Sequence, residues 1–447
     1  MPAAFPDAYG WGAEATGGRG GTVYYVTNTD NSGAGSLRNA LEAAGARIIV
    51  FSVAGNITLT SAIIITNPYV TVAGQSAPGS GIVINGERLI LQTHNAVFRY
   101  LSWMGQGGGS EVSMFTIRSH ADGVNNIMID HCSVYWGSDD NIDCWFGDNA
   151  AHPDIYNITV QNCILAEPPS AHPTNLLMGT QANTENMGTD RLHHISIHNN
   201  LFANCGHRNP LLAAQHSEVI NNTVYNWQNR IGGFKDNAEV DWLANYNKTK
   251  SEGTLRFIRD NATQAYEADP SASVYIDDNI ITGELTSTAT ENWASPFLLE
   301  NYGSNELPST DHKRTTRLGL PTYSIPILAA AAAYERHLTQ AGNSRRLDSN
   351  GKWVNRRDSE DTRIIADVTN GTGADDVPDG PGTIPTPVAG TAYTDTDGDG
   401  MPDDYEDANS LDKNSASDGP TIAGNGYSNV ENFLNGPNDV YVGIIAA

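Results

Sequence analysis

The stretch NIMIDHCSVYWGSDDNIDCWF, residues 126–146, decides the fold of this chain. Apolar residues recur at every second position where it begins, with Ile127 and Ile129 as the first pair, and this period is typical of a strand with one buried face. The stretch then turns acidic. Carboxylate oxygens gathered in a turn after a short strand suit calcium, although aspartate is also common in ordinary turns. The candidate calcium ligands in this turn are Asp139, Asp140 and Asp143.

The same pattern, an apolar residue followed three positions later by Cys or Asn, returns along the chain. A coil cannot bury its apolar strand alone, so successive coils must stack, and inward Asn side chains then hydrogen-bond along the stack as a ladder. The repeat therefore predicts an all-β chain folded as a right-handed parallel β-helix. The wide gap before the last copy leaves room for one coil that the pattern does not show. The copies are Ile127, Ile129 and Cys132; Ile158, Val160 and Cys163; Ile195, Ile197 and Asn200; Val219 and Asn222; and Val274, Ile276 and Asn279.

A β-propeller and a β-sandwich are the alternative folds. A propeller would show four strands per unit, and a sandwich would show frequent tight hairpin signals such as Asn-Gly. The coil region contains Asn85-Gly86 as its only Asn-Gly pair, which favours the β-helix. Short helices are expected from Ser36 to about Ala44 and from Pro326 to Leu338, the second with its proline at the start.

Composition divides the chain into three parts. Residues 1–370 are expected to form the β-helix domain, with coils mainly over 47–290 and a segment over 291–370 packed back on them. Residues 371–393 are rich in Gly, Pro and Thr and predict a flexible linker. Residues 394–447 then form a small module of their own.

This C-terminal module contains the most specific short motif of the chain. Residues 395–406 read DTDGDGMPDDYE and fit the calcium loop D-x-D-x-D-G-x5-E of an EF-hand. In such a loop the glycine takes the sharp turn, a backbone carbonyl fills the seventh place and the final glutamate binds through both oxygens. A degenerate second loop follows at Asn425, Gly426 and Glu431. The expected calcium ligands are Asp395, Asp397, Asp399, Met401, Asp403 and Glu406.

Acidic residues outnumber basic ones by 51 to 25, which argues against nucleic acid as a partner, and no apolar run is long enough to predict a membrane span. We expect a monomer.

The four cysteines are too few for a disulfide scaffold and lack the spacing of a zinc site. Cys132 and Cys163 occupy equivalent repeat positions, so they are expected as stacked interior thiols, with a disulfide between neighbouring coils as the alternative. The opening MPAAFPDAYG is typical of a mature start after an initiator Met, which predicts secretion to an extracellular or periplasmic location.

With the repeat and the acidic turn established, the chain resembles the pectate lyases of polysaccharide lyase family 1. The resemblance rests on TGGRGGTVYYVTN, GAGSLRNAL, NIMIDHCSVYWGSDDNID, HHISIHNNLFANCGHRNP and DTRIIADVTNGTG, and it covers nearly all of residues 5–372. It implies an enzyme that cleaves an acidic polysaccharide, homogalacturonan before other polyuronates, by calcium-assisted β-elimination. The C-terminal calcium loop resembles modules appended to such secreted enzymes.

The resemblance also implies site residues. An arginine in a segment like HRNP is the proton-abstracting base of the family, and the matching residue is Arg208. Glu111 matches an acidic calcium ligand from a preceding coil, whereas Ser113 stands where an aspartate is usual. A lysine expected before LLMGT is absent, as is a second arginine shortly after HRNP. The residues expected to contact substrate carboxylates or hydroxyls are His172, His207, Arg230 and Lys235.

Two other functions stay open from the sequence. A polygalacturonase-like glycoside hydrolase on the same fold would use paired carboxylates as acid and base, which Asp139-Asp140 loosely matches. A non-catalytic carbohydrate-binding β-helix would explain the absent lysine and arginine. The products separate the three functions, because a lyase makes an unsaturated, ultraviolet-absorbing end, a hydrolase makes only reducing ends, and a binding protein makes neither.

Overall fold

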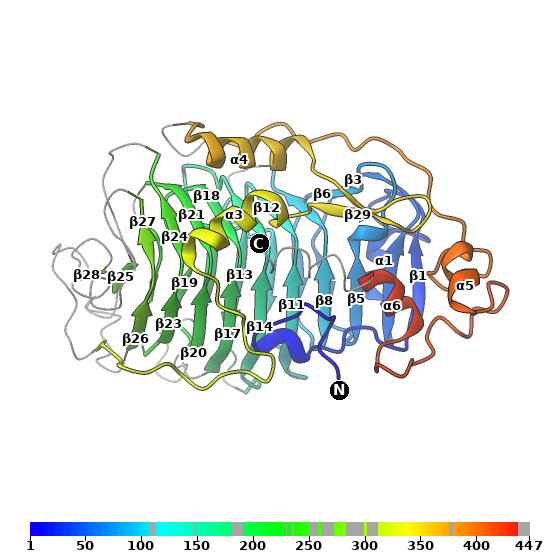
Figure 1. The fold of residues 1–447 in the computed structure, drawn as a ribbon, viewed down its shortest axis with the longest axis horizontal. Helices are drawn as coiled ribbons and strands as arrows, with labels where there is room; N and C mark the ends of the chain where they lie inside the picture. The colour runs from blue at the N-terminus through cyan, green and yellow to red at the C-terminus, as the bar shows by residue number, and fades with distance from the viewer. Residues whose placement is uncertain are drawn as a thin grey trace.

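The structure is a computed structural model that describes residues 1–106, 112–146, 149, 151–180, 191–228, 230–234, 237–250, 258–260, 272–282, 299–301, 312–374 and 380–436. Over these residues the chain winds into a parallel β-helix in which successive coils contribute strands to three long parallel sheets (Figure 1). Equivalent residues of successive coils lie opposite one another: Ile127 pairs with Ile158, and Ile158 pairs with Ile195. The predicted parallel, all-β architecture is confirmed.

We call the three sheets A, B and C, and the described chain passes from A to B to C within each coil. Sheet A contains β1 (Thr22–Val26), β2 (Arg47–Phe51), β5 (Val70–Ala73), β8 (Ala96–Arg99), β11 (Val124–Asp130), β14 (Ile155–Gln161), β17 (Leu192–His198), β20 (Gln215–Ile220), β23 (Glu239–Leu243) and β26 (Ser273–Asp277). Sheet B contains β3 (Gly55–Leu59), β6 (Ile82–Gly86), β9 (Ser102–Met104), β12 (Ser133–Tyr135), β15 (Ile164–Ala166), β18 (Leu201–Cys205), β21 (Thr223–Trp227), β24 (Tyr246–Lys248) and β27 (Ile280–Ile281). Sheet C contains β4 (Ile63–Ile65), β7 (Leu89–Leu91), β10 (Phe115–Arg118), β13 (Ile142–Phe146), β16 (Leu176–Thr180), β19 (Leu211–Leu212), β22 (Gly233–Phe234), β25 (Ile258–Asp260) and β28 (Leu299–Asn301).

The main hydrophobic core runs through the inside of the coils. Ile127 and Ile129 of β11, and Ile158 and Val160 of β14, are all buried there, as their spacing predicts. Complete burial of one such side chain contributes about 2 kcal/mol. Because each coil covers the open end of the coil before it, this stacking makes the fold continuous from one coil to the next.

The turn between sheets A and B contains the expected asparagine ladder. Asn200 donates from Nδ2 to Oδ1 of Asn222 at 3.0 Å, Asn222 donates to Asn245 at 3.1 Å, and Asn245 donates to Asn279 at 2.8 Å. All four side chains are buried, and each of the first three pairs with the amide of the next coil, so the ladder fixes how these coils stack.

The ladder continues into the cysteines and also reveals the coil that the sequence pattern missed. The amide N–H of Cys163 donates to Oδ1 of Asn200 at 2.9 Å, and Cys132 and Cys163 are buried free thiols, so the disulfide alternative is wrong.

The missed coil contains β23 and β24. It escaped notice because Trp242 stands where the other copies carry Ile or Val, although its ladder residue Asn245 is present.

Helices cover the outside of the coils. The helix α1 (Leu37–Glu42) begins at Ser36, whose side chain accepts from the Asn39 amide, as predicted. The helix predicted from Pro326 begins later, because the backbone of Leu328 exchanges two hydrogen bonds with the side chain of Asn221 and stays extended. The other elements outside the three sheets are η1 (Trp11–Glu14), η2 (Gly74–Ser76), α3 (Ala330–Gln340), β29 (Arg345–Leu347), β30 (Trp353–Asn355), α4 (Ser359–Asn370), α5 (Asp403–Asn409) and α6 (Asn429–Asn435).

The segment that follows the coils returns along sheet B. Both α3 and α4 lie over the outside of this sheet (Figure 1). Asp361 of α4 accepts hydrogen bonds from the hydroxyls of Tyr135 at 2.6 Å and Ser133 at 3.0 Å. The helices α3 and α4, which follow the coils in sequence, therefore pack on the outside of sheet B.

The C-terminal module is docked on the first coils, beside β1 (Figure 1). From the module, Met401 and the α6 residue Phe433 pack in one buried cluster with Ile48 and Val50 of β2. The preceding segment is also attached, because the carbonyl of Val388 accepts from the Ser80 amide at 2.9 Å. Within the segment for which composition predicts a flexible linker, Val388 is thus hydrogen-bonded to the β-helix.

In the part of the chain that the structure describes, no helix is long and apolar enough to cross a membrane.

Candidate active site

The candidate site residues lie in the loops that lead from sheet B to sheet C. The acidic turn joins β12 to β13, His172 lies between β15 and β16, Arg208 lies between β18 and β19, and Arg230 lies between β21 and β22. Because parallel coils stack with their equivalent loops on the same side, four successive coils place these residues on one side of the β-helix. The topology therefore brings together residues that are far apart in sequence.

A second asparagine ladder fixes these loops. Asn141 donates from Nδ2 to Oδ1 of Asn175 at 2.7 Å, and Asn175 donates to Oδ1 of Asn209 at 2.8 Å; all three side chains are fully buried. Two of the three ladder residues directly follow a candidate site residue: Asn141 follows Asp140, and Asn209 follows Arg208. The ladder therefore holds the two site residues at fixed positions along the stack.

Asp140 and Arg208 form the centre of the site. Nη1 of Arg208 lies 2.8 Å from Oδ2 of the buried Asp140. Burial raises the pKa of Asp140 to about 7, against the opposing charge of Arg208. Oδ1 of Asp140 and Nε of Arg208 are buried and make no hydrogen bond with any residue that the structure describes. The pair thus keeps one acceptor and one donor for a further partner.

The backbone of the acidic turn is held closely by its neighbours. The Asp140 amide donates to Oγ of Ser113 at 3.3 Å, so the serine at the position of the expected aspartate supports this turn through its hydroxyl. Gly137 opens the turn, and a Cβ atom there would lie only 2.3 Å from the Asp140 carbonyl oxygen. Any other residue at position 137 would displace the acidic turn.

Asp139 pairs with His172 of the next coil. Oδ1 of Asp139 lies 2.8 Å from Nδ1 of His172. This contact lowers the pKa of Asp139 and raises the pKa of His172, since each charge stabilises the other. The hydroxyl of Thr174 donates to the Asp139 carbonyl at 2.7 Å, which links the two loops a second time.

Asp143 lies on β13 and has two partners on the neighbouring strand β10. Its Oδ1 accepts from the Thr116 hydroxyl at 2.6 Å, and its Oδ2 accepts from Nη1 of Arg118 at 2.7 Å. Burial raises the pKa of Asp143, while Arg118 opposes that shift. Both oxygens are therefore engaged, and Asp143 does not converge with Asp139 and Asp140 on one point in the described residues.

The remaining predicted site residues are partly described. Nη2 of Arg230 lies 3.4 Å from Nδ1 of His207, so these two side chains meet in the loops after β18 and β21. Glu111 and Lys235 lie outside the described residues. Arg118 was not singled out as a site residue from the sequence, because only the pairing of β10 with β13 places its guanidinium on Asp143.

Comparison with known proteins identifies the family. No family model matches the chain. A protein of Aspergillus oryzae named "Probable pectate lyase C" is 32% identical over 445 residues, which span 97% of this chain and 93% of that protein. The protein of the same name from Emericella nidulans is 31% identical over 435 residues, with 97% of this chain and 92% of that protein covered. The chain belongs to the pectate lyase family. It is accordingly a polysaccharide lyase.

Solved structures of the family agree with this fold. A pectate lyase studied for its substrate specificity and anti β-elimination mechanism has a TM-score of 0.53 at 15% identity, over 76% of this chain and 97% of that one. A pectate lyase bound to a hexasaccharide has a TM-score of 0.52 at 13% identity, over 76% of this chain and 97% of that one. At such low identity the likeness concerns the β-helix alone.

The second asparagine ladder gives a testable expectation for this pectate lyase. Asn175→Ala leaves the buried amide of Asn141 without its acceptor, which costs about 1–3 kcal/mol of folding free energy. It should also lower kcat, because the loops that carry Asp140 and Arg208 lose their common support. The measurement is kcat together with the melting temperature of each variant.

Asn245→Ala is the matched control, since it removes an equally buried ladder amide between sheets A and B, away from the site. It should lower the melting temperature to a similar extent and leave kcat nearly unchanged. Equal losses of kcat in both variants would contradict a positioning role for Asn175.

The loop predicted from the EF-hand pattern is partly rearranged. Asp395 accepts from the amides of Gly398 and Gly400, and from the hydroxyl of Tyr25 on β1. Asp403 accepts from the amide and hydroxyl of Thr396. These two carboxylates hold the loop together, and Met401 is buried against the β-helix. Three of the predicted ligands instead converge with an aspartate from the following loop: Asp397, Asp399, Glu406 and Asp418.

Proposed function

We propose that this chain cleaves a polyuronate, homogalacturonan first, by β-elimination with Arg208 as the base. The observation that carries the proposal is the set of contacts and the exposure of the Arg208 guanidinium. It is held by Asp140 through Nη1, its buried Nε has no partner among the described residues, and its side chain keeps 20% of its surface exposed. Such a group is rigid and partly accessible, and it retains hydrogen-bonding capacity for a substrate.

The backbone at Arg208 supports the same assignment. Arg208 has a φ of 61°, in the left-handed region that costs a non-glycine residue on the order of 1 kcal/mol or more. Its carbonyl accepts from the Leu176 amide at 2.9 Å, and the next amide, that of Asn209, donates to the Ile231 carbonyl at 3.1 Å. Neighbouring coils on both sides therefore hold the arginine in this conformation, which fixes the direction of its side chain.

The proposed reaction depends on the acidity of the C–H bond next to the uronate carboxylate. The base removes the proton on the carbon next to the uronate carboxylate, the electron pair forms a carbon–carbon double bond, and the bond from the adjacent carbon to the glycosidic oxygen breaks. The leaving oxygen takes up a proton. Negative charge grows on the uronate carboxylate in the transition state, so positive side chains around it stabilise that state more than the ground state.

A free guanidinium is effectively always protonated, so Arg208 needs a strongly positive surrounding to act as a base. Asp139 and Asp140 would hold a calcium ion together with substrate carboxylates, and the buried Oδ1 of Asp140, which has no hydrogen-bond partner among the described residues, fits that role. Calcium would supply positive charge that opposes protonation of Arg208 and neutralises the substrate. Asp143 fits less well, because both of its oxygens are engaged by Thr116 and Arg118.

The same loops supply the proposed contacts to the acidic polymer. His172, whose pKa is raised by Asp139, and the His207–Arg230 pair lie on successive coils along one side of the β-helix. We assign them to the carboxylates and hydroxyls of successive sugars. Lys235 and Glu111 remain proposed as a substrate contact and a calcium ligand. Because polymeric pectate is encountered outside cells, we also propose that the enzyme is secreted.

The deciding experiment incubates the full chain with homogalacturonan and other polyuronates, with calcium or with excess chelator. A lyase releases ultraviolet-absorbing unsaturated ends, and we expect this product with calcium on homogalacturonan. Reducing ends without ultraviolet absorbance would indicate a glycoside hydrolase instead. Binding without either product would indicate a non-catalytic protein.

Asp139→Ala tests the calcium role of the acidic turn. The variant should fold normally and lose most activity at moderate calcium, because one proposed ligand and the His172 contact are removed. Higher calcium should restore part of the lost rate. The measurement is the rate of unsaturated product formation across a calcium titration.

Asp122→Ala is the matched control, because the Asp122 side chain is 81% exposed and lies in a loop between sheets C and A. It should follow the same calcium dependence as the unchanged protein. Full activity of Asp139→Ala in excess chelator would exclude a calcium site at this turn.

A further inference from the structure

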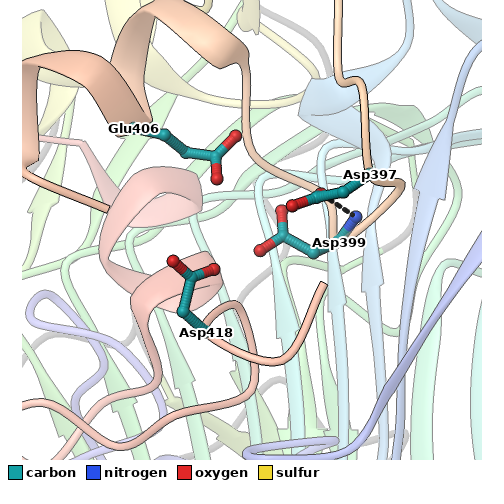
Figure 2. Close-up of side chains that lie close together, drawn as sticks. All are labelled: Asp397, Asp399, Glu406 and Asp418. Atoms are coloured by element: carbon teal, nitrogen blue, oxygen red, sulfur yellow. Dashed lines mark hydrogen bonds between the residues drawn. The ribbon is translucent and has the colours of Figure 1, made fainter. Parts of the chain in front are cut away.

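Four carboxylates of the C-terminal module point toward one another (Figure 2). Asp397 and Asp399 come from the loop before α5, Glu406 comes from α5, and Asp418 comes from the loop between α5 and α6. One oxygen from each lies within 4.8 Å of the corresponding oxygens of the others. This geometry places four ligand atoms around one point.

Two of these carboxylates are buried and two are half-buried, and several of their oxygens have no partner among the described residues. Glu406 is fully buried and Asp399 is 2% exposed. Both oxygens of Glu406, Oδ2 of Asp397 and of Asp399, and Oδ1 of Asp418 form no hydrogen bond within the described residues. Nor does any described lysine or arginine form an ion pair with the four. Buried, uncompensated negative charge is costly, so the cluster requires a positive charge that the described side chains do not supply.

We propose that Asp397, Asp399, Glu406 and Asp418 bind a calcium ion that fastens the C-terminal module to the amino-terminal end of the β-helix. All ligand atoms are oxygens, and carboxylates that bind through one or both oxygens meet the coordination number and loose geometry of calcium. Magnesium demands a tighter octahedron and keeps more water, so it fits this cluster less well. The ligand set differs from an EF-hand, because Asp418 joins from a second loop while Asp395 is used elsewhere.

The ion would join two loops that are both attached to the first coils. On one side, Asp395 of the ligand loop accepts from the Tyr25 hydroxyl on β1. On the other side, the carbonyl of Asp418 accepts from the side chain of Asn429, the first residue of α6, at 2.9 Å. Glu431 of α6 in turn forms an ion pair with Arg19 at 3.0 Å. Calcium at the cluster therefore closes a continuous set of contacts from β1 through the module and back to the N-terminal segment.

The test measures calcium stoichiometry by calorimetry, the melting temperature, and amide hydrogen exchange in β1 and β2. For the full chain, saturating calcium should raise the melting temperature by a few degrees and slow exchange in β1 and β2, because ligand binding stabilises the folded state. Magnesium at the same concentration should have a smaller effect. Asp418→Asn should lose one bound calcium and both responses, and should retain its rate on pectate at a temperature below its unfolding.

Asp404→Asn is the matched control, since Asp404 is an exposed residue of α5 outside the cluster and the charge change is identical. It should behave like the unchanged protein. If Asp418→Asn fails to fold, the half-buried Asp397→Asn tests the same ligand set. Unchanged stoichiometry and thermal response in a folded cluster variant would overturn the proposal.

Asp139→Ala separates this site from the candidate active site. It should lose activity yet keep the calcium-dependent rise in melting temperature and the slowed exchange in β1 and β2. Loss of these responses in Asp139→Ala, with retention in Asp418→Asn, would place the stabilising ion in the candidate active site and overturn the inference. A protein that is inactive on every polyuronate would refute the proposed function without altering these thermal results.

Discussion

Replacing Arg208 with lysine should lower kcat on homogalacturonan by a factor of about 100 or more and change KM little. Lysine keeps the positive charge but loses the planar fork, and its proton affinity differs from that of a guanidinium. A contact made only in the transition state affects kcat, whereas a contact made equally in the bound substrate affects KM. The measurement is kcat, KM and the melting temperature of Arg208→Lys beside the unchanged protein.

Arg191→Lys provides a matched control. Arg191 pairs with Asp154 in the region between sheets C and A, away from the loops between sheets B and C. This change should leave kcat nearly unchanged. A purely structural Arg208 would show itself by a lower melting temperature, and a residue that only binds substrate would show itself by a higher KM. A near-normal kcat for Arg208→Lys would remove Arg208 from the mechanism.

Deleting residues 380–447 should destabilise the β-helix from its amino-terminal end. The deletion exposes Ile48 and Val50, which the module covers, and removes Phe433 from the shared cluster. Burial of each large apolar side chain contributes about 2 kcal/mol, so losing the cluster costs several times that amount. We expect a melting temperature lower by ten degrees or more, on the order implied for a loss of this size, and a tendency to aggregate.

A shorter deletion that ends the chain after Gly436 keeps the docked helix α6 and serves as the control. Its melting temperature should lie well above that of the protein lacking residues 380–447, because Phe433 and the shared cluster are kept. If the protein lacking 380–447 folds with an unchanged melting temperature and full activity, the module is independent of the β-helix, as the composition of residues 371–393 predicts.

The coil architecture could be read from the sequence because its causes are local. Period-two apolar pairs such as Ile127 and Ile129 mark strands with one buried face, and a Cys or Asn three residues later marks the ladder position. Repetition then requires stacking, and stacking fixes which loops share a side. Stacking thus explains why Asp140 and Arg208 lie on one side although 68 residues separate them in the chain, whereas their assignment to one site from the sequence came from the resemblance to the pectate lyases.

Other features depend on pairs that no local pattern records. Arg118 meets Asp143 only because β10 pairs with β13, and the coil of Trp242 becomes visible only when Asn245 takes its place in the ladder.

The docking of the C-terminal module shows the same limit most clearly. Composition predicts a tether over 371–393, but the contact between Arg19 and Glu431 joins residues 412 positions apart. The loop motif likewise predicts ligands within twelve consecutive residues, whereas Asp418 enters from the next loop. A sequence repeat determines what each coil buries, because burial follows from the strand itself. Only the tertiary structure decides which distant charges and apolar faces meet. The free energy of such a contact depends on where the fold places the partner residue, which no local pattern records.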